Sequence, residues 1–211
     1  NRNWHPFVGE TVRQMKQDGV RRFLTFVTSG FSCYSGCRQY REDIARAIGE
    51  AGEGPPASDK IRVYYNHPLF IDVQRRHWQQ ARQRLPAELR ADAVTLFTAH
   101  SIPGAMAAGC DYEVQLQEAS RLTAEAAGIA KWRLVYQSRS GPPTQPWLEP
   151  DVCDTLRELH GQGVKAVILD PIGFISDHME VLYDLDREAR ELAGELGLAL
   201  VRAATPGTHP L

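Results

Sequence analysis

Three carboxylates stand at steps of four residues in the segment 171–188: Glu180, Asp184 and Glu188. A buried-strand pattern over residues 166–169 runs into a proline–glycine turn, and we expect a helix to follow. Residues four apart lie on one face of a helix, so these acids repel each other and do not stabilise it. Just past a strand end they could receive a divalent cation or hold a proton. A solvated acidic face is the alternative interpretation.

A histidine stands at the end of another predicted strand. Residues 94–98 are apolar and rich in β-forming side chains, which is typical of a buried parallel strand. His100 follows, and Pro103 disfavours a helical conformation at the residue before it, so the chain turns there. A lone histidine is more often a structural hydrogen-bonding residue. Because open α/β sheets bind ligands beyond the carboxyl ends of their strands, the histidine and the acids together favour a shared site.

Strand and helix patterns alternate along the chain. We expect strands near residues 23–28, 61–65, 94–98, 133–138, 164–169 and 199–202, and helices over residues 7–18, 36–51, 68–85, 112–127, 151–160 and 177–196. This alternation predicts an α/β fold with parallel sheets and helices on both faces. Right-handed crossovers then bring the strand ends to one edge.

Composition excludes several classes of function. The chain has 211 residues, 43% of them hydrophobic and 24% charged, with a net charge of −2, as in globular proteins with a sizeable core. Nucleic-acid binding would need a basic face, and no apolar run approaches the roughly 18 residues of a membrane span. No G-x-S-x-G elbow is present, which argues against a hydrolase of that type.

The cysteine pattern predicts reduced thiols and a cytoplasmic protein. Four cysteines in a chain of this length form no paired framework: Cys33, Cys37, Cys110 and Cys153. Cys33 and Cys37 are close in sequence, but no second cysteine or histidine pair completes a zinc site.

Four blocks of the sequence resemble the ferrochelatase family, in its order and at about its spacing. They are FTAHSIP at 97–103, YQSRSGP at 136–142, PWLEPD at 146–151 and GFISDHMEVLYD at 173–184. The blocks NRNW at 1–4 and YSGCRQY at 34–40 are most similar to the Gram-positive and actinobacterial branch. That branch resembles the coproporphyrin ferrochelatases, which insert iron into coproporphyrin III and form coproheme.

The resemblance implies two Rossmann-like lobes of the chelatase type around a central cleft. We expect residues 1–69 to be the remainder of the first lobe and residues 70–211 to be the second lobe. The family pattern also has strand–helix units before residue 1 and a helix after residue 211, so we expect this chain to be incomplete at both ends.

The resemblance implies a lyase of heme biosynthesis that takes Fe²⁺ and a porphyrin as its substrates. It assigns iron binding and catalysis to His100 and Glu180. His100 suits a base or a metal ligand, because neutral imidazole has one nitrogen lone pair. Asp184 and Glu188 would pass a hydrated cation inward or carry protons out, and Fe²⁺ accepts mixed oxygen and nitrogen ligands.

Four further residues are predicted to contact the porphyrin. Tyr40 matches a porphyrin-contacting tyrosine of the family, with an aromatic packed inside the lobe as the alternative. Arg139, next to Ser138 at a strand end, could pair with a propionate or form a surface salt bridge. Trp147 could line the porphyrin slot or pack on the loop at 142–143.

Some alternatives stay open at this point. The substrate could be protoporphyrin IX, or the chain could belong to another tetrapyrrole chelatase or be a non-catalytic fragment that binds metal or porphyrin. Some ferrochelatases carry a two-iron two-sulfur cluster, which we expect only in a longer chain. The protein is expected to be a monomer without nucleic-acid partners.

Overall fold

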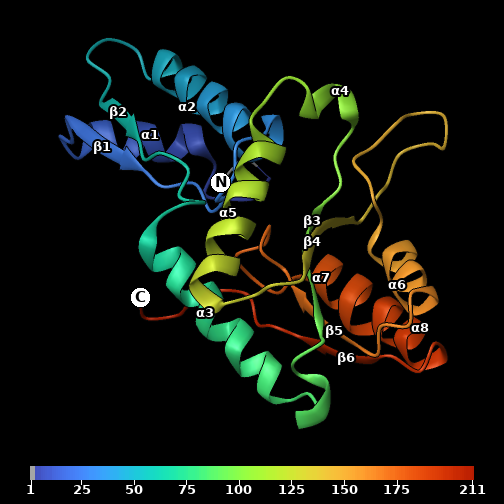
Figure 1. The fold of residues 1–211 in the computed structure, drawn as a ribbon. Coiled ribbons are helices and arrows are strands. Elements are labelled where there is room, and N and C mark those ends of the chain that lie inside the picture. Colours follow the sequence, from blue (N-terminus) through green and yellow to red (C-terminus); the bar gives the residue numbers. More distant parts are fainter. Residues whose placement is uncertain (1–2) are drawn as a thin grey trace. The chain divides into compact units, whose positions relative to one another are not determined.

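The structure is a computed structural model that describes residues 3–211. Asn1 and Arg2, which belong to one of the blocks that carry the family resemblance, lie outside the described residues. The chain divides into two compact units, Asn1–Val63 and Tyr64–Leu211, so the division lies six residues before the predicted one after residue 69. Each unit combines parallel strands with helices, which confirms the predicted α/β class (Figure 1).

The first unit contains a two-stranded parallel sheet of β1 (Arg22–Thr25) and β2 (Ala57–Lys60). Helix α1 (Val8–Gln17) packs against helix α2 (Gln39–Glu50). A π-helical turn, η1 (Tyr34–Arg38), leads into α2. The predicted helix over residues 36–51 is therefore preceded and partly replaced by this wider turn.

The predicted strand at residues 61–65 is wrong, because β2 ends at Lys60. The apolar residues 61 and 63 suggested a strand, but the hydrogen bonds to β1 fix its position. They begin where Ala57 N–H donates to the Arg21 carbonyl at 2.9 Å, and the Ile61 N–H donates to the Thr25 carbonyl at 3.0 Å. Pairing with a partner strand has more weight here than the apolar pattern.

The second unit is built on a four-stranded parallel sheet with the strand order β4-β3-β5-β6. Its strands are β3 (Val94–His100), β4 (Trp132–Gln137), β5 (Ala166–Asp170) and β6 (Ala199–Arg202). The central strands β3 and β5 are buried along almost their whole length, as parallel strands covered on both faces should be. Strand β3 extends two residues beyond the predicted 98, so that His100 is its last residue.

Helices cover both faces of this sheet. They are α3 (Pro68–Gln83), the 3₁₀ turn η2 (Ala87–Leu89), α4 (Gly104–Ala107), α5 (Tyr112–Ala127), α6 (Val152–Gly161), α7 (Met179–Tyr183), the π-helical turn η3 (Asp184–Ala189) and α8 (Arg190–Glu195). On one face Trp78 and Ala81 of α3 pack on Ile168. On the other face Leu156 of α6 and Leu185 of η3 pack on Leu169. Successive residues of β5 thus point to opposite helical layers.

The predicted helix over residues 177–196 is interrupted. It begins at Met179, not at 177, and its middle is the π-helical turn η3 between α7 and α8. A π-helical turn has more residues per turn than an α-helix, so the helix does not keep one regular period over residues 179–195. Within residues 3–211, no helix combines the length and apolar character that crossing a bilayer requires.

Candidate active site at the ends of two strands

Hydrogen bonds to the backbone fix His100 and its neighbour at the end of β3. The Tyr112 hydroxyl donates to the His100 carbonyl at 3.1 Å, and the next residue, Ser101, donates its hydroxyl to the Leu148 carbonyl at 2.8 Å. The imidazole Nδ1 contacts the Ser101 carbonyl oxygen. Because a carbonyl only accepts hydrogen bonds, Nδ1 carries the proton and the Nε2 of a neutral His100 presents its lone pair.

A carboxylate oxygen of Glu180 faces that lone pair. Its Oε1 lies 3.6 Å from His100 Nε2, and its Oε2 lies 3.8 Å from His178 Nδ1. The side chain of Glu180 is 51% exposed and that of His100 is 32% exposed, so the pair is accessible from solvent. A carboxylate oxygen and an imidazole lone pair are both acceptors, and they attract each other only when a proton or a cation stands between them.

A glycine brings the connection after β5 against the end of β3. Gly173 N–H donates to the Thr98 carbonyl at 3.0 Å. A Cβ atom on Gly173 would lie 2.6 Å from the Cβ and 2.8 Å from the Cα of Ala99. Only glycine allows this approach, and it places the chain that leads to Glu180 beside His100.

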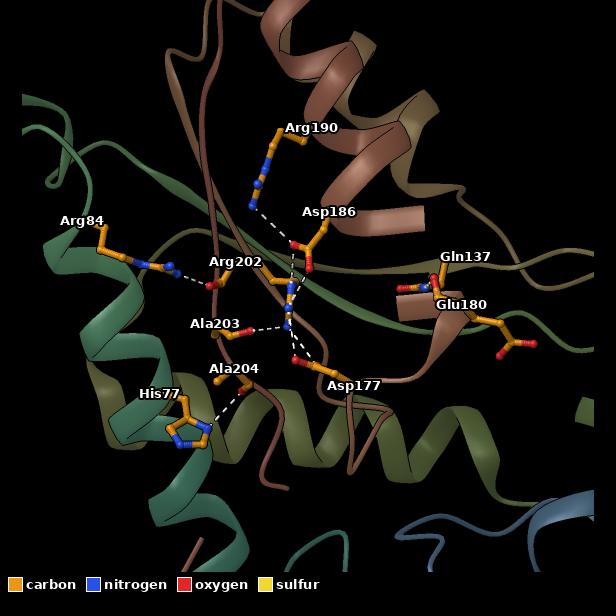
Figure 2. Close-up of polar contacts among 10 residues, drawn as sticks. All are labelled: His77, Arg84, Gln137, Asp177, Glu180, Asp186, Arg190, Arg202, Ala203 and Ala204. Atoms are coloured by element: carbon orange, nitrogen blue, oxygen red, sulfur yellow. Dashed lines mark hydrogen bonds and ion pairs between the residues drawn. The ribbon is translucent and has the colours of Figure 1, made fainter. Parts of the chain in front are cut away.

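Asp184 is held by the end of β4. The Gln137 side-chain amide donates to Asp184 Oδ2 at 3.2 Å, and the Ser138 hydroxyl donates to the same oxygen. The amide of Gln137 also lies 3.4 Å from the backbone carbonyl of Glu180 (Figure 2). Ser138 has a φ of 62°, a left-handed conformation that is uncommon and strained for a residue other than glycine.

Asp184 and Glu188 line one groove of about 520 Å³, whereas Glu180 is not among the residues that line it. The other lining residues are Gln137, Ser138, Arg139, Asp151, Val152, Cys153, Arg157, Glu191, Leu192 and Glu195. The three acids predicted to form one row are therefore divided between two places. One of them stands beside the histidine and two face an acidic groove.

Arg139 is occupied by its own loop. Its Nη2 lies 3.5, 3.4 and 3.1 Å from the carbonyl oxygens of Pro142, Pro143 and Gln145, and its Nη1 lies 4.0 Å from Glu149. The guanidinium is partly exposed at the end of β4, next to Ser138. In this structure it organises the loop that follows the strand.

Trp147 packs against the same loop and pairs with the segment after β3. A Cβ atom on Gly141 would lie 2.2 Å from Trp147 Nε1, so the glycine backbone packs directly on the indole. Trp147 also forms an isolated antiparallel bridge with Pro103. Tyr40 lies in the first unit, where it lines a hollow with residues of α1 and β1.

Sequence reasoning missed two residues that hold the site, Gln137 and Arg202. Each is the last residue of its strand and has a largely buried polar side chain. A polar side chain that ends an apolar strand pattern was a signal in the sequence. Asp177 and Asp186, the partners of Arg202, had no such signal, because acids on a predicted helix are usually solvated.

The described residues contain no cluster of three or more histidine, cysteine, aspartate or glutamate side chains arranged to hold a metal ion. The pair of His100 and Glu180 offers a nitrogen and two oxygens, and His178 Nδ1 lies 3.8 Å from the second of these oxygens. A cation at this pair would need further ligands from elsewhere, such as water or a bound molecule.

Solved structures similar to this chain are chelatases. SirB from Bacillus subtilis with Fe³⁺ has a TM-score of 0.70 and 11% sequence identity, over 98% of this chain and 73% of that one. The sirohydrochlorin chelatase SirB from Bacillus subtilis subspecies spizizenii in complex with cobalt has a TM-score of 0.62 and 12% identity, over 98% of this chain and 71% of that one. At such low identity the likeness shows the fold, and it confirms the predicted chelatase type.

Sequence comparison gives much closer relatives. A ferrochelatase of Rhodopirellula baltica is 54% identical over 211 residues, which are 100% of this chain and 60% of the relative. Coproporphyrin III ferrochelatases of Nocardia farcinica and Mycolicibacterium smegmatis are each 50% identical over 100% of this chain, and over 62% and 63% of the relatives. The chain thus spans about 60% of the length of these curated relatives. Because the family model described as Ferrochelatase matches residues 1–211 as well, the chain belongs to the ferrochelatase family.

Proposed function

We propose that the full-length protein inserts Fe²⁺ into a porphyrin, and that this porphyrin is coproporphyrin III. The observation that carries the proposal is the pair of facing acceptors, His100 Nε2 and Glu180 Oε1, 3.6 Å apart at two neighbouring strand ends. Membership of the ferrochelatase family supports iron insertion as the reaction. The names of two relatives at 50% identity support the choice of coproporphyrin.

Insertion of iron into a porphyrin requires proton transfer and metal exchange at one place. Two pyrrole N–H protons leave, and Fe²⁺ loses water as it binds four ring nitrogens. A base must therefore face the ring, and the slot must exclude water. His100 is that base or a transient ligand, because its Nε2 lone pair is free when Nδ1 donates to Ser101. Glu180 stabilises the proton or the cation that arrives between the two side chains.

The acidic groove gives charges a route to and from this pair. Asp184 and Glu188 line it, and Asp184 lies one helical turn from Glu180. Its carboxylate accepts hydrogen bonds from Gln137 and Ser138, which hold it in a fixed place. We assign to the groove the release of protons or the supply of hydrated cation.

The test is anaerobic metalation by the full-length protein with Fe²⁺ and coproporphyrin III, followed by absorbance. We expect His100→Ala and Glu180→Gln each to lower kcat by roughly 10²- to 10⁴-fold, the contribution of a positioned acid or base. His160→Ala and Glu88→Gln are matched controls, because both residues are exposed and lie outside the site. Wild-type rates in the two site variants would refute the proposal. Porphyrin binding without turnover would identify a binding protein instead.

The choice of substrate is tested by turnover with coproporphyrin III against protoporphyrin IX. Coproporphyrin has four propionates, so it gains more from a guanidinium such as Arg139. We expect a higher kcat/KM for coproporphyrin III, and a rise in its KM in Arg139→Ala. Arg121→Ala is the control, because Arg121 pairs with Glu118 and Glu125 on the surface of α5. A preference for protoporphyrin IX would overturn this part alone.

A further inference from the structure

We propose that Arg202, the last residue of β6, is the positioning residue for Glu180, an inference that rests on the proposed function. Its guanidinium makes a bidentate pair with Asp186: Nε donates to Oδ1 and Nη2 to Oδ2, both at 2.8 Å. It makes a second one with Asp177: Nη1 donates to Oδ1 at 3.1 Å and Nη2 to Oδ2 at 3.2 Å. Figure 2 shows Arg202 between the two acids.

The coordination of Arg202 is complete. Its second Nη1 hydrogen bond goes to the Ala203 carbonyl at 3.1 Å, so each of the five guanidinium N–H groups has a partner. The side chain is only 13% exposed, against 38% for Asp177 and 24% for Asp186. Planar bidentate pairs of this kind fix direction as well as distance. This is unlike an exposed ion pair, which contributes little.

The two acids bracket the catalytic glutamate in the chain. Asp177 stands three residues before Glu180 and Asp186 six residues after it. Arg202 is itself fixed to the sheet, because it pairs with Leu169 of β5 and the Ala203 N–H donates to the Leu169 carbonyl at 2.8 Å. The guanidinium therefore ties both ends of α7, the short helix that carries Glu180, to the edge of the sheet.

A second tie acts from the opposite edge of the sheet. Gln137, at the end of β4, contacts the Glu180 backbone carbonyl and the Asp184 carboxylate. Since β4 and β6 are the two outer strands, the segment from Asp177 to Asp186 is held from both edges of the sheet. In Figure 2 the Glu180 carboxylate points away from Arg202. The contacts of Arg202 with Asp177 and Asp186, which we call the Arg202 clamp, thus leave the Glu180 carboxylate free to face His100.

The Arg202 clamp also separates two groups of acids: Asp177 and Asp186 pair with the guanidinium, whereas Glu180 faces His100. Asp177 and Asp186 share the Arg202 guanidinium, and Arg190 adds a single longer contact to Asp186 at 3.4 Å. Without Arg202, the two partly buried carboxylates would lose the guanidinium that lies between them and would repel each other, which displaces α7. A lysine cannot replace it, because one ammonium cannot make two planar bidentate pairs.

The experiment is a double-mutant cycle in the full-length protein between Arg202→Met and Glu180→Gln, read as metalation of coproporphyrin III by Fe²⁺. We expect Arg202→Met to lower kcat roughly 10- to 100-fold, as a small misplacement of a catalytic group does, with porphyrin KM within about twofold. In the Glu180→Gln background the same change should have almost no effect, because Arg202 acts through Glu180. A merely structural role would lower both backgrounds equally and overturns the proposal.

The control is Arg190→Met, which removes a guanidinium that also contacts Asp186 but is 63% exposed. We expect it to keep wild-type kcat. Arg202→Lys keeps the charge and carries the test if the methionine variant does not fold. It should show a lowered kcat and an altered pH profile of kcat at near-unchanged melting temperature, and wild-type kcat in it contradicts the clamp. An inactive Glu180→Gln beside a fully active Arg202→Lys refutes this inference alone, whereas an active Glu180→Gln refutes the proposed function.

Discussion

The two halves of the candidate site are held in different ways. His100 is a strand residue: it is paired with Gln137 of β4, and the next residue, Ser101, donates its N–H to the Gln137 carbonyl. Glu180 lies ten residues beyond the end of β5, and it depends on Gly173, Gln137 and Arg202 for its position. Changes near β3 should therefore be tolerated, whereas changes on the β5 side should move the site.

Among the residues that support His100 and Glu180, the largest effect is expected where the two halves touch. Gly173→Val places a branched side chain against Ala99, whose Cβ and Cα would lie 2.6 and 2.8 Å from the new Cβ atom. Overpacking of this kind should cost about 1–3 kcal/mol of unfolding free energy. Separation of the two strand ends should lower metalation roughly 100-fold. Chemical denaturation and activity assays check both.

Gly161→Ala is the control for that change, because nothing lies within 4 Å of a Cβ atom at this helical glycine. We expect it to be neutral or slightly stabilising. If Gly173→Val were equally harmless, the close contact between the strand ends would not hold the site together.

The second prediction concerns the end of β5 itself. Asp170 is completely buried, and neither carboxylate oxygen has a hydrogen-bond partner among residues 3–211. Burial raises its pKa to about 8. Its register partner on β3 is the apolar Phe97. In the unfolded chain the carboxyl ionises near its usual pKa of about 4, while the folded protein keeps it protonated. Stability from this group is therefore complete below about pH 4 and is lost as the pH rises toward 8.

Between these limits the unfolding free energy should fall by about 1.4 kcal/mol per pH unit, or about 2.7 kcal/mol from pH 5 to pH 7. Asp170→Asn removes the ionisation and should flatten this slope. Urea denaturation at pH 5, 6 and 7 measures the difference between the two proteins. Parallel pH dependences would mean that the buried carboxyl is solvated or paired in solution.

Much of this architecture was predictable from the sequence, for reasons that differ between elements. The helix over Tyr112–Ala127 and the strand Ala199–Arg202 have the predicted bounds. In the helix the apolar periodicity coincides with the buried face, which includes Leu116 and Ala119. The position of β2 was not predictable, because its partner strand decides it. The π-helical turn at Asp184 and the Arg202 clamp were also not predictable from the sequence, because they depend on contacts between residues far apart in sequence.

The third prediction concerns the Ser138 hydroxyl, which donates to Asp184 from a strained backbone. Ser138→Ala keeps the left-handed strain and removes one of two donors, which should cost about 1 kcal/mol. Ser138→Gly also removes the donor but relieves the strain, so we expect it to be the more stable of the two. Both should lower metalation by the same factor if the hydroxyl acts through Asp184, as paired assays can measure. Unequal losses would assign the effect to the backbone.

The smallest effect is expected on the β3 side. Tyr112→Phe removes the hydroxyl that donates to the His100 carbonyl at 3.1 Å and should cost about 0.5–1.5 kcal/mol of stability. Metalation should stay within about twofold of the wild type, because Ser101 N–H still donates to the Gln137 carbonyl and holds the strand end in place. Gln137→Leu is the matched change for the half of the site that contains Glu180, since it removes the amide that contacts Glu180 and Asp184. If Tyr112→Phe lowered kcat as much as Gln137→Leu does, the backbone alone would not position His100, and the two halves of the site would be equally fragile.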